Sequence, residues 1–120
     1  MTCATMAAEP LIRGDWLVPG THLDLIGAYR PDMREADDAA LSRARIFCDS
    51  RKTAGETGEL LMPLASGAID AKAILADLYE PEAMRREGAH EVTLYKNGGG
   101  AHLDLMVSRH VLDAWRAARA

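Results

Sequence analysis

The glycine run Gly98-Gly99-Gly100 is the feature of this sequence that could most directly do chemistry. It follows a β-branched run and precedes an amphipathic segment, so it predicts a turn from a strand into a helix. Backbone without side chains lets a ligand approach closely, and the N-terminus of a helix attracts anions. The run matches neither GxGxxG nor GxxxxGK(S/T), however, so a plain tight turn before the final helix is the favoured interpretation.

The histidines and the clustered acidic residues do not form a recognisable catalytic set. No nucleophile motif and no HExxH spacing accompanies any of the histidines, which are His22, His90, His102 and His110. His102 is the one that could line a site, because it stands at the start of the predicted final helix with Asp104 and Lys96 close in sequence. Helix capping and compensation of a helix dipole are the favoured roles of the acidic cluster, which comprises Asp32, Glu35, Asp37 and Asp38.

Composition is typical of one globular domain. The chain has 120 residues, of which 48% are hydrophobic and 27% charged. A net charge of -4 without a Lys/Arg cluster argues against a nucleic-acid partner. No apolar run approaches the ~20 residues of a membrane span and no signal peptide is recognisable, so we expect a cytoplasmic protein without a membrane partner. Cys3 and Cys48 lack CxxC spacing and neighbouring histidines, which predicts buried reduced thiols and no metal site.

The elements that must position these side chains begin with a βαβ unit. Residues 1–5 predict a short strand, as though the chain began within a fold, and His22 to Gly27 alternate like a buried strand. A helix is expected from Ala39 to Ala44, followed by a strand from Arg45 to Ser50. The fold class is therefore α/β with a parallel pair of strands, and ligands of such sheets bind outside the carboxyl ends of the strands.

The second half of the chain predicts two helical stretches, a strand and a terminal helix. Residues 51–62 and 69–79 have helical patterns, and Val92 to Tyr95 predict a strand. Residues 101–119 form a strong amphipathic pattern. Its apolar stripe could pack on the sheet of this chain, on another part of the same protein or on another subunit, and packing in the core of this chain is the favoured alternative.

Three ordered blocks closely resemble the ornithine cyclodeaminase/mu-crystallin family. They are residues 9–38, Phe47-Cys48-Asp49-Ser50 and residues 92–98. The resemblance implies a Rossmann domain joined to a dimerisation and substrate domain in a much longer protein. The dinucleotide glycine fingerprint is absent from this chain, so we expect a fragment: a partial Rossmann-like parallel sheet in residues 1–64, and in residues 65–120 a C-terminal strand and helix that return to the dimerisation domain.

The resemblance also implies a set of site residues. Thr5 matches a threonine beside the nucleotide, and Leu23 to Ile26 match a strand whose backbone lies along the cofactor, which is NAD or NADP. Asn97 stands where many relatives have a serine at the nicotinamide end, and Glu56 matches an acidic residue near the substrate pocket. A purely structural role for each of these residues is an equally weighted alternative.

The branch of the family follows from Tyr29 and the three residues after it. True cyclodeaminases carry a proton-transferring aspartate where this chain has Tyr29, whereas Arg30-Pro31-Asp32 resembles the ketimine-reductase branch. The resemblance therefore implies a reductase of cyclic imines such as pyrroline- or piperideine-2-carboxylate, homo-oligomeric at full length and inactive as this fragment alone. The alternatives are a non-catalytic remnant or dimerisation module that binds a partner chain and, ranked last, a small-molecule carrier. The exposed strand edge predicts that the isolated chain is marginally stable or prone to aggregation.

Overall fold

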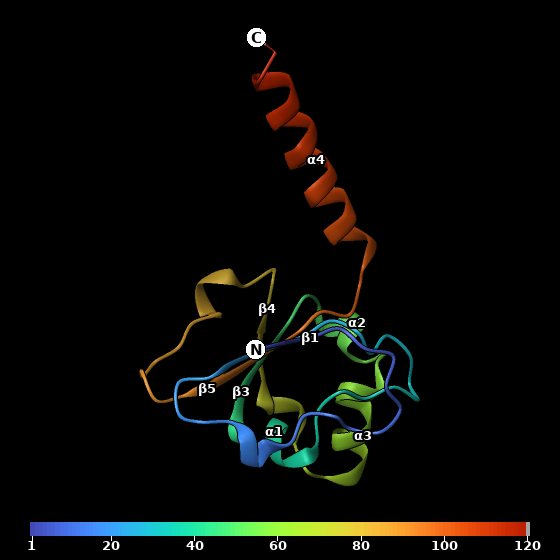
Figure 1. Cartoon of the computed structure of the whole chain (residues 1–120), viewed down its shortest axis with the longest axis vertical. Coiled ribbons are helices and arrows are strands. Elements are labelled where there is room, and N and C mark those ends of the chain that lie inside the picture. Colours follow the sequence, from blue (N-terminus) through green and yellow to red (C-terminus); the bar gives the residue numbers. More distant parts are fainter. Residues whose placement is uncertain (120) are drawn as a thin grey trace.

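One parallel β-sheet organises the chain. The computed structural model describes residues 1–119, apart from the side chains of residues 53 and 54. Within this range the sheet has five strands in the order β1-β2-β5-β3-β4, and every neighbouring pair is parallel (Figure 1). The strands are β1 (Thr2–Cys3), β2 (His22–Leu25), β3 (Ala44–Cys48), β4 (Ile74–Asp77) and β5 (Val92–Lys96). The predicted α/β class with a parallel sheet is confirmed.

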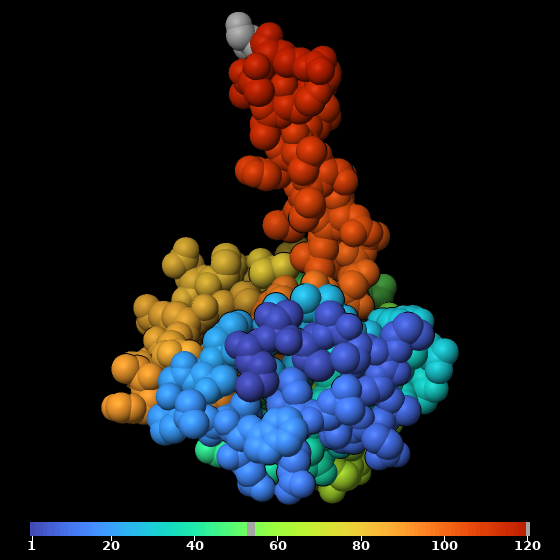
Figure 2. Space-filling view, viewed as in Figure 1, coloured from blue at the N-terminus to red at the C-terminus, as the bar shows by residue number. Residues whose placement is uncertain are grey.

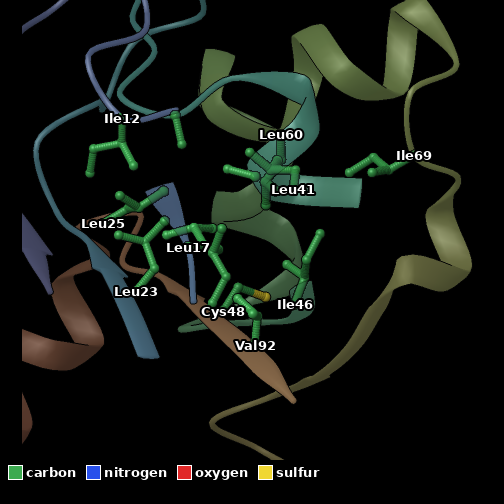
Figure 3. Close-up of a cluster of buried hydrophobic side chains, with 13 residues drawn as sticks. Ile12, Leu17, Leu23, Leu25, Leu41, Ile46, Cys48, Leu60, Ile69 and Val92 are labelled. Carbon is green, nitrogen blue, oxygen red and sulfur yellow. The ribbon is translucent and has the colours of Figure 1, made fainter. Parts of the chain in front are cut away.

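Helices cover one face of this sheet and build the core there. The α-helices are α1 (Asp38–Arg43), α2 (Arg51–Ala54), α3 (Gly58–Ser66) and α4 (Ala101–Ala117), and short 3-10 turns lie at Gly14–Trp16, Ala71–Ala73 and Pro81–Ala83. Leu41 of α1 and Leu60 of α3 are buried in one cluster with strand residues (Figure 3). The strand side chains of this cluster are Leu23, Leu25, Ile46, Cys48, Val92 and Leu94.

The predicted βαβ unit is present, but its two strands are not neighbours. β2 and β3 are parallel, and β5 lies between them and pairs with both. Leu94 of β5 is completely buried, opposite Leu23 on one side and Ile46 on the other. The last strand of the chain is therefore the centre of the sheet. Sequence order alone could not predict this insertion.

The helix predicted over residues 69–79 is wrong. After the 3-10 turn at Ala71–Ala73, the chain forms β4, which pairs with the free edge of β3. Ala76 pairs with Phe47 and is completely buried. Alanine and leucine favour helices intrinsically, but pairing with β3 outweighs that weak preference in a run of four residues.

The terminal helix α4 forms as predicted, but the predicted packing in the core is wrong. α4 projects away from the sheet (Figures 1 and 2), and none of its residues is buried. Its apolar side chains are exposed, including Met106 at 58% and Trp115 at 51%. Helical spacing of apolar residues establishes that one face is apolar, and it does not identify what covers that face.

The predicted division at residue 64 does not coincide with a boundary of the sheet. β4 and β5 belong to residues 65–120, yet both pair with β3. Among the described elements, α4 alone leaves the body of the fold (Figure 1). The separate roles assigned to the two segments stay a prediction.

Candidate functional site at the carboxyl edge of the sheet

The carboxyl ends of the strands form one row across the sheet. Strand register places Cys3, Leu25, Lys96, Cys48 and Asp77 side by side in that order. The loops that follow these residues start from the same edge, where open parallel sheets bind their ligands. This edge therefore brings together Thr5, Ile26 and Asn97, which follow β1, β2 and β5.

Glu35 joins the first two of these loops. Its Oε1 accepts hydrogen bonds from Thr5 N at 2.6 Å and Thr5 Oγ1 at 3.0 Å. Its Oε2 accepts from Gly27 N at 2.8 Å and Ala28 N at 3.3 Å. Although burial by itself raises the pKa of Glu35, the hydrogen bonds from Thr5, Cys3 and Gly27 bring that pKa below its ordinary value. Glu35 is therefore an ionised acceptor at neutral pH.

Gly27 allows the loops after β1 and β2 to touch. A Cβ atom at this position would lie 1.9 Å from Thr5 O and 2.1 Å from Thr5 N. No side chain fits such a gap, because real Cβ atoms do not approach backbone so closely. The absence of a side chain at Gly27 thus allows the backbone of Thr5 to lie against the end of β2.

Two further buried charges lie behind this edge. Glu59 of α3 accepts hydrogen bonds from Glu35 N at 2.7 Å and Ala36 N at 3.0 Å, and its side chain is wholly buried. Lys96 is also wholly buried, and its Nζ donates to Leu25 O at 3.4 Å.

Burial dominates the titration of both groups. Burial raises the pKa of Glu59, although the hydrogen bonds from Glu35 N and Ala36 N and the charge of Lys96 act to lower it. It lowers the pKa of Lys96 against the attraction of Glu59 and Glu35.

Asn97 extends the same row at the end of β5. Its backbone N–H donates to Leu25 O at 2.9 Å, so this carbonyl receives both Asn97 N and Lys96 Nζ. The side-chain Oδ1 accepts from Gly99 N at 2.8 Å, and Gly99 has a φ of 79°. The amide NH2 of Asn97 is therefore the group that this side chain can offer to a ligand.

The glycine run is an irregular link between β5 and α4 instead of the tight turn that its sequence favours, and Asp49 anchors it. Gly100 N donates to Asp49 Oδ2 at 3.4 Å, and Ser50 N donates to Asp49 Oδ1 at 2.9 Å. His102 Nε2 lies 4.0 Å from Asp49 Oδ2, and the rings of His102 and Tyr79 are 6.1 Å apart. His102 thus lines the edge beside Asp49, whereas its neighbours in sequence, Asp104 and Lys96, are not its partners in these interactions.

The other predicted site residues differ in how far their side chains are accessible to a ligand. The side chain of Leu23 is completely buried in the core, so the predicted contact of this residue with a cofactor concerns its backbone and stays a prediction. Ile26, just after β2, is 42% exposed and is the accessible side chain of that segment. Glu56 is exposed between α2 and α3. Its loop lies beside the segment after β2, because a Cβ atom at Gly58 would meet Pro31 O at 2.3 Å.

Glu35 and Lys96 are two residues whose roles the sequence does not predict. The capping role expected for the acidic cluster holds for Asp37, whose side chain accepts from Ala40 N at the start of α1. It is wrong for Glu35, which binds the loops after β1 and β2 instead. No local pattern predicts this role, because the partners of Glu35 include Thr5, which is 30 residues distant in sequence. Lys96 follows an apolar run that gives no sign of a buried charge.

The two cysteines agree with their predicted burial only in part. Cys48 is buried and free, and burial raises its pKa to about 11. Cys3 is also free but only partly buried. Among the described residues no group of three or more His, Cys, Asp or Glu side chains could hold a metal ion. None of the helices in that part of the chain has the length and apolar character needed to cross a membrane.

Comparison with protein families gives one match over almost the whole chain. The model described as the ornithine cyclodeaminase/mu-crystallin family matches residues 1–119. A delta(1)-pyrroline-2-carboxylate reductase of Paracoccus denitrificans (strain Pd 1222) is 56% identical over 115 residues, which are 92% of this chain and 36% of that protein. The chain thus spans about a third of the length of the curated relatives that it matches.

Solved structures share the fold of this chain. The delta(1)-pyrroline-2-carboxylate reductase of Thermococcus litoralis, in complex with NADH and L-proline, superposes with a TM-score of 0.77 at 33% identity over 82% of this chain and 32% of that one. An archaeal alanine dehydrogenase dimer with bound NAD superposes with a TM-score of 0.84 at 26% identity, over 99% of this chain and 38% of that one.

Proposed function

The chain belongs to the ornithine cyclodeaminase/mu-crystallin family, and on that premise we propose that it is part of an NAD(P)H-dependent reductase of cyclic imines such as pyrroline-2-carboxylate. The observation that carries the proposal is the 56% identity to the Paracoccus reductase along nearly the whole chain. Tyr29, 53% exposed after β2, occupies the position of the aspartate that cyclodeaminases use for proton transfer, which favours reduction over cyclodeamination.

The carboxyl edge fits one part of such a cofactor. Thr5, Ile26 and Asn97 lie at the ends of adjacent strands and present a hydroxyl oxygen, an apolar side chain and an amide NH2. Together they could hold the nicotinamide and its ribose against the sheet. A GxGxxG fingerprint for the diphosphate is absent from the chain, so we assign that contact to another part of the catalytic protein.

The chemistry of the reaction assigns this chain a positioning role. The bound cofactor would supply the hydride that adds to the imine carbon, a proton ends on the ring nitrogen, and the cyclic amino acid is released. Residues of this edge orient the reduced ring and exclude water from one side of it, and such positioning contributes much of the barrier reduction in transfer reactions. Glu56 is our candidate contact to the substrate, because its loop lies beside the segment after β2.

The experiment that tests this proposal is a segment exchange. Residues 1–120 replace the matching segment of the Paracoccus reductase, and oxidation of NADH and NADPH by pyrroline-2-carboxylate is followed at 340 nm. We expect turnover by the exchanged protein and none by the chain alone. A folded exchange protein without turnover would refute the reductase function. Enzyme-like turnover by the chain alone would refute the need for further parts.

A second candidate function, a module that binds a partner chain, is favoured by α4. Its exposed apolar side chains lie together, and a groove of about 400 Å³ is lined by Val107, Ser108, Val111, Leu112 and Trp115. In this view α4, and not all of residues 65–120, returns to the dimerisation domain or to a partner subunit. Light scattering during size exclusion tests the idea: a clean monomer that binds no longer relative would count against it.

A further inference from the structure

The hydrogen-bond polarity at the end of β1 follows from the ionised state of Glu35. A carboxylate can only accept hydrogen bonds, so the Thr5 hydroxyl must donate its one proton to Oε1, 3.0 Å away. Toward any ligand, Thr5 Oγ1 is then left with lone pairs only. Ala7 N donates to the same oxygen at 3.4 Å and Cys3 Sγ lies 4.0 Å from it, and both contacts are too long to saturate the two lone pairs.

The backbone amides at the end of β2 are also occupied by Glu35. Backbone N–H groups at the end of a strand are the donors that commonly bind phosphates and carboxylates. Here Gly27 N and Ala28 N both donate to Glu35 Oε2. Thr5 N donates to the other oxygen at 2.6 Å. The corner between β1 and β2 therefore has its donors satisfied internally and a negative charge directly behind it.

We propose that Glu35 is a positioning residue that makes the β1–β2 corner a hydrogen-bond acceptor, so that Thr5 receives a neutral donor of the ligand and no phosphate binds there. In a nicotinamide nucleotide the neutral donors are the carboxamide NH2 and the ribose hydroxyls. The identity of the ligand rests on the proposed function. The polarity of the corner does not, because it follows from the contacts of Glu35 alone.

The first test needs no ligand. The carboxyl carbon of Glu35 is followed by NMR titration in the 120-residue chain, in the isosteric variant Thr5→Val and in Thr5→Ser, which keeps the hydroxyl. We expect Glu35 to titrate below the ordinary glutamate range, to shift upward in Thr5→Val and to return toward the original value in Thr5→Ser. Titration in the ordinary range, or no shift in Thr5→Val, would overturn the proposal whatever the chain binds.

The second test identifies the donor in the exchanged protein. Its affinity for NADH is compared with that for the reduced 3-acetylpyridine analogue, in which a methyl group replaces the carboxamide NH2. If the carboxamide is the donor, the analogue binds about tenfold more weakly, as one lost hydrogen bond implies, and Thr5→Val removes the difference. If a ribose hydroxyl is the donor, Thr5→Val weakens both nucleotides alike. An unchanged affinity for both in Thr5→Val would contradict the proposal.

A matched control separates positioning from general loss of stability. Asp37→Ala removes the N-cap of α1, and the Asp37 side chain accepts from Ala40 N and Gly14 N and not from Thr5, so the variant should lower the melting temperature without changing the affinity ratio. Absence of binding by either nucleotide would overturn the proposed function and the assignment of the donor. In that case the titration of Glu35 would still decide the polarity of the corner.

Discussion

Replacing Lys96 by methionine tests whether the buried charges behind the carboxyl edge stabilise one another. Lys96 is wholly buried, and its hydrogen bond to Leu25 O, at 3.4 Å, is longer than the usual range. Its pKa is lowered by burial against the attraction of Glu59 and Glu35. Methionine has a similar length and no charge, so the variant removes the ammonium without opening a large cavity.

The expected loss follows from the balance of these effects. Among the described residues Lys96 Nζ forms no ion pair within 4.0 Å, so its attraction to the carboxylates acts at longer range, and the loss should be about 2 kcal/mol, below the about 3–5 kcal/mol typical of breaking a buried charged pair. Glu59→Gln should cost about 3 kcal/mol, because one of its two accepted hydrogen bonds is also lost. The double variant should lose about 3 kcal/mol instead of the sum of about 5, a coupling of about 2 kcal/mol.

Urea unfolding at pH 7, followed by far-ultraviolet circular dichroism, measures these free energies. Tryptophan fluorescence is a poor probe, because Trp16 and Trp115 are 57% and 51% exposed in the folded chain. Lys72→Met is the matched control, since Lys72 is exposed and should change stability by less than about 0.5 kcal/mol. A Lys96→Met variant as stable as the parent, or additive single and double losses, would refute the reasoning.

Three further predictions concern pH, thiol reactivity and backbone packing. Hydrogen bonds hold the pKa of Glu35 below its value in the unfolded chain, so the contribution of Glu35 to stability is fully present above the unfolded pKa and is lost as the pH falls through the folded pKa. Glu35→Gln should therefore flatten the acid side of the pH dependence in melting experiments. Iodoacetamide should modify Cys3 before Cys48, whose pKa is raised to about 11, and mass mapping that finds equal rates would disprove the difference in burial. Gly27→Ala should lose more than about 3 kcal/mol because of its contacts with backbone, whereas Gly67→Ala, with φ 77° and no atom within 4 Å, should lose only about 1 kcal/mol in urea titrations.

The parts of the fold that local pattern determines were predictable from the sequence. Alternation identified β2, and a helical stripe identified α4 along nearly its full length. The position of β5 in the middle of the sheet depends on pairing between segments about 50 and 70 residues apart, which leaves no local pattern. The pattern of residues 69–79 predicts a helix where β4 forms, because four residues are too few to separate the helical period from the strand period.

The residues of the candidate site are likewise predictable from the sequence only in part. Thr5 and Asn97 were predicted from the family resemblance, and the structure brings both to one edge, in line with strands that pair through β2. Glu35 was assigned to capping because it stands near a helix start and its true partners are distant in sequence. Buried polar groups must satisfy their hydrogen bonds somewhere, but only a tertiary structure shows where.

The residues on the two sides of the glycine run Gly98-Gly99-Gly100 are held very differently, and this decides what can move. On one side, Asn97 is fixed by Leu25 O in a row of paired strands. On the other, the start of α4 is held to the sheet by Asp49, which accepts from Gly100 N, while no residue of the helix is buried. A 17-residue helix without tertiary cover is close to the length at which helices are only marginally stable in water. The helical content of α4 therefore depends on what covers its apolar face, whereas the geometry of the carboxyl edge does not.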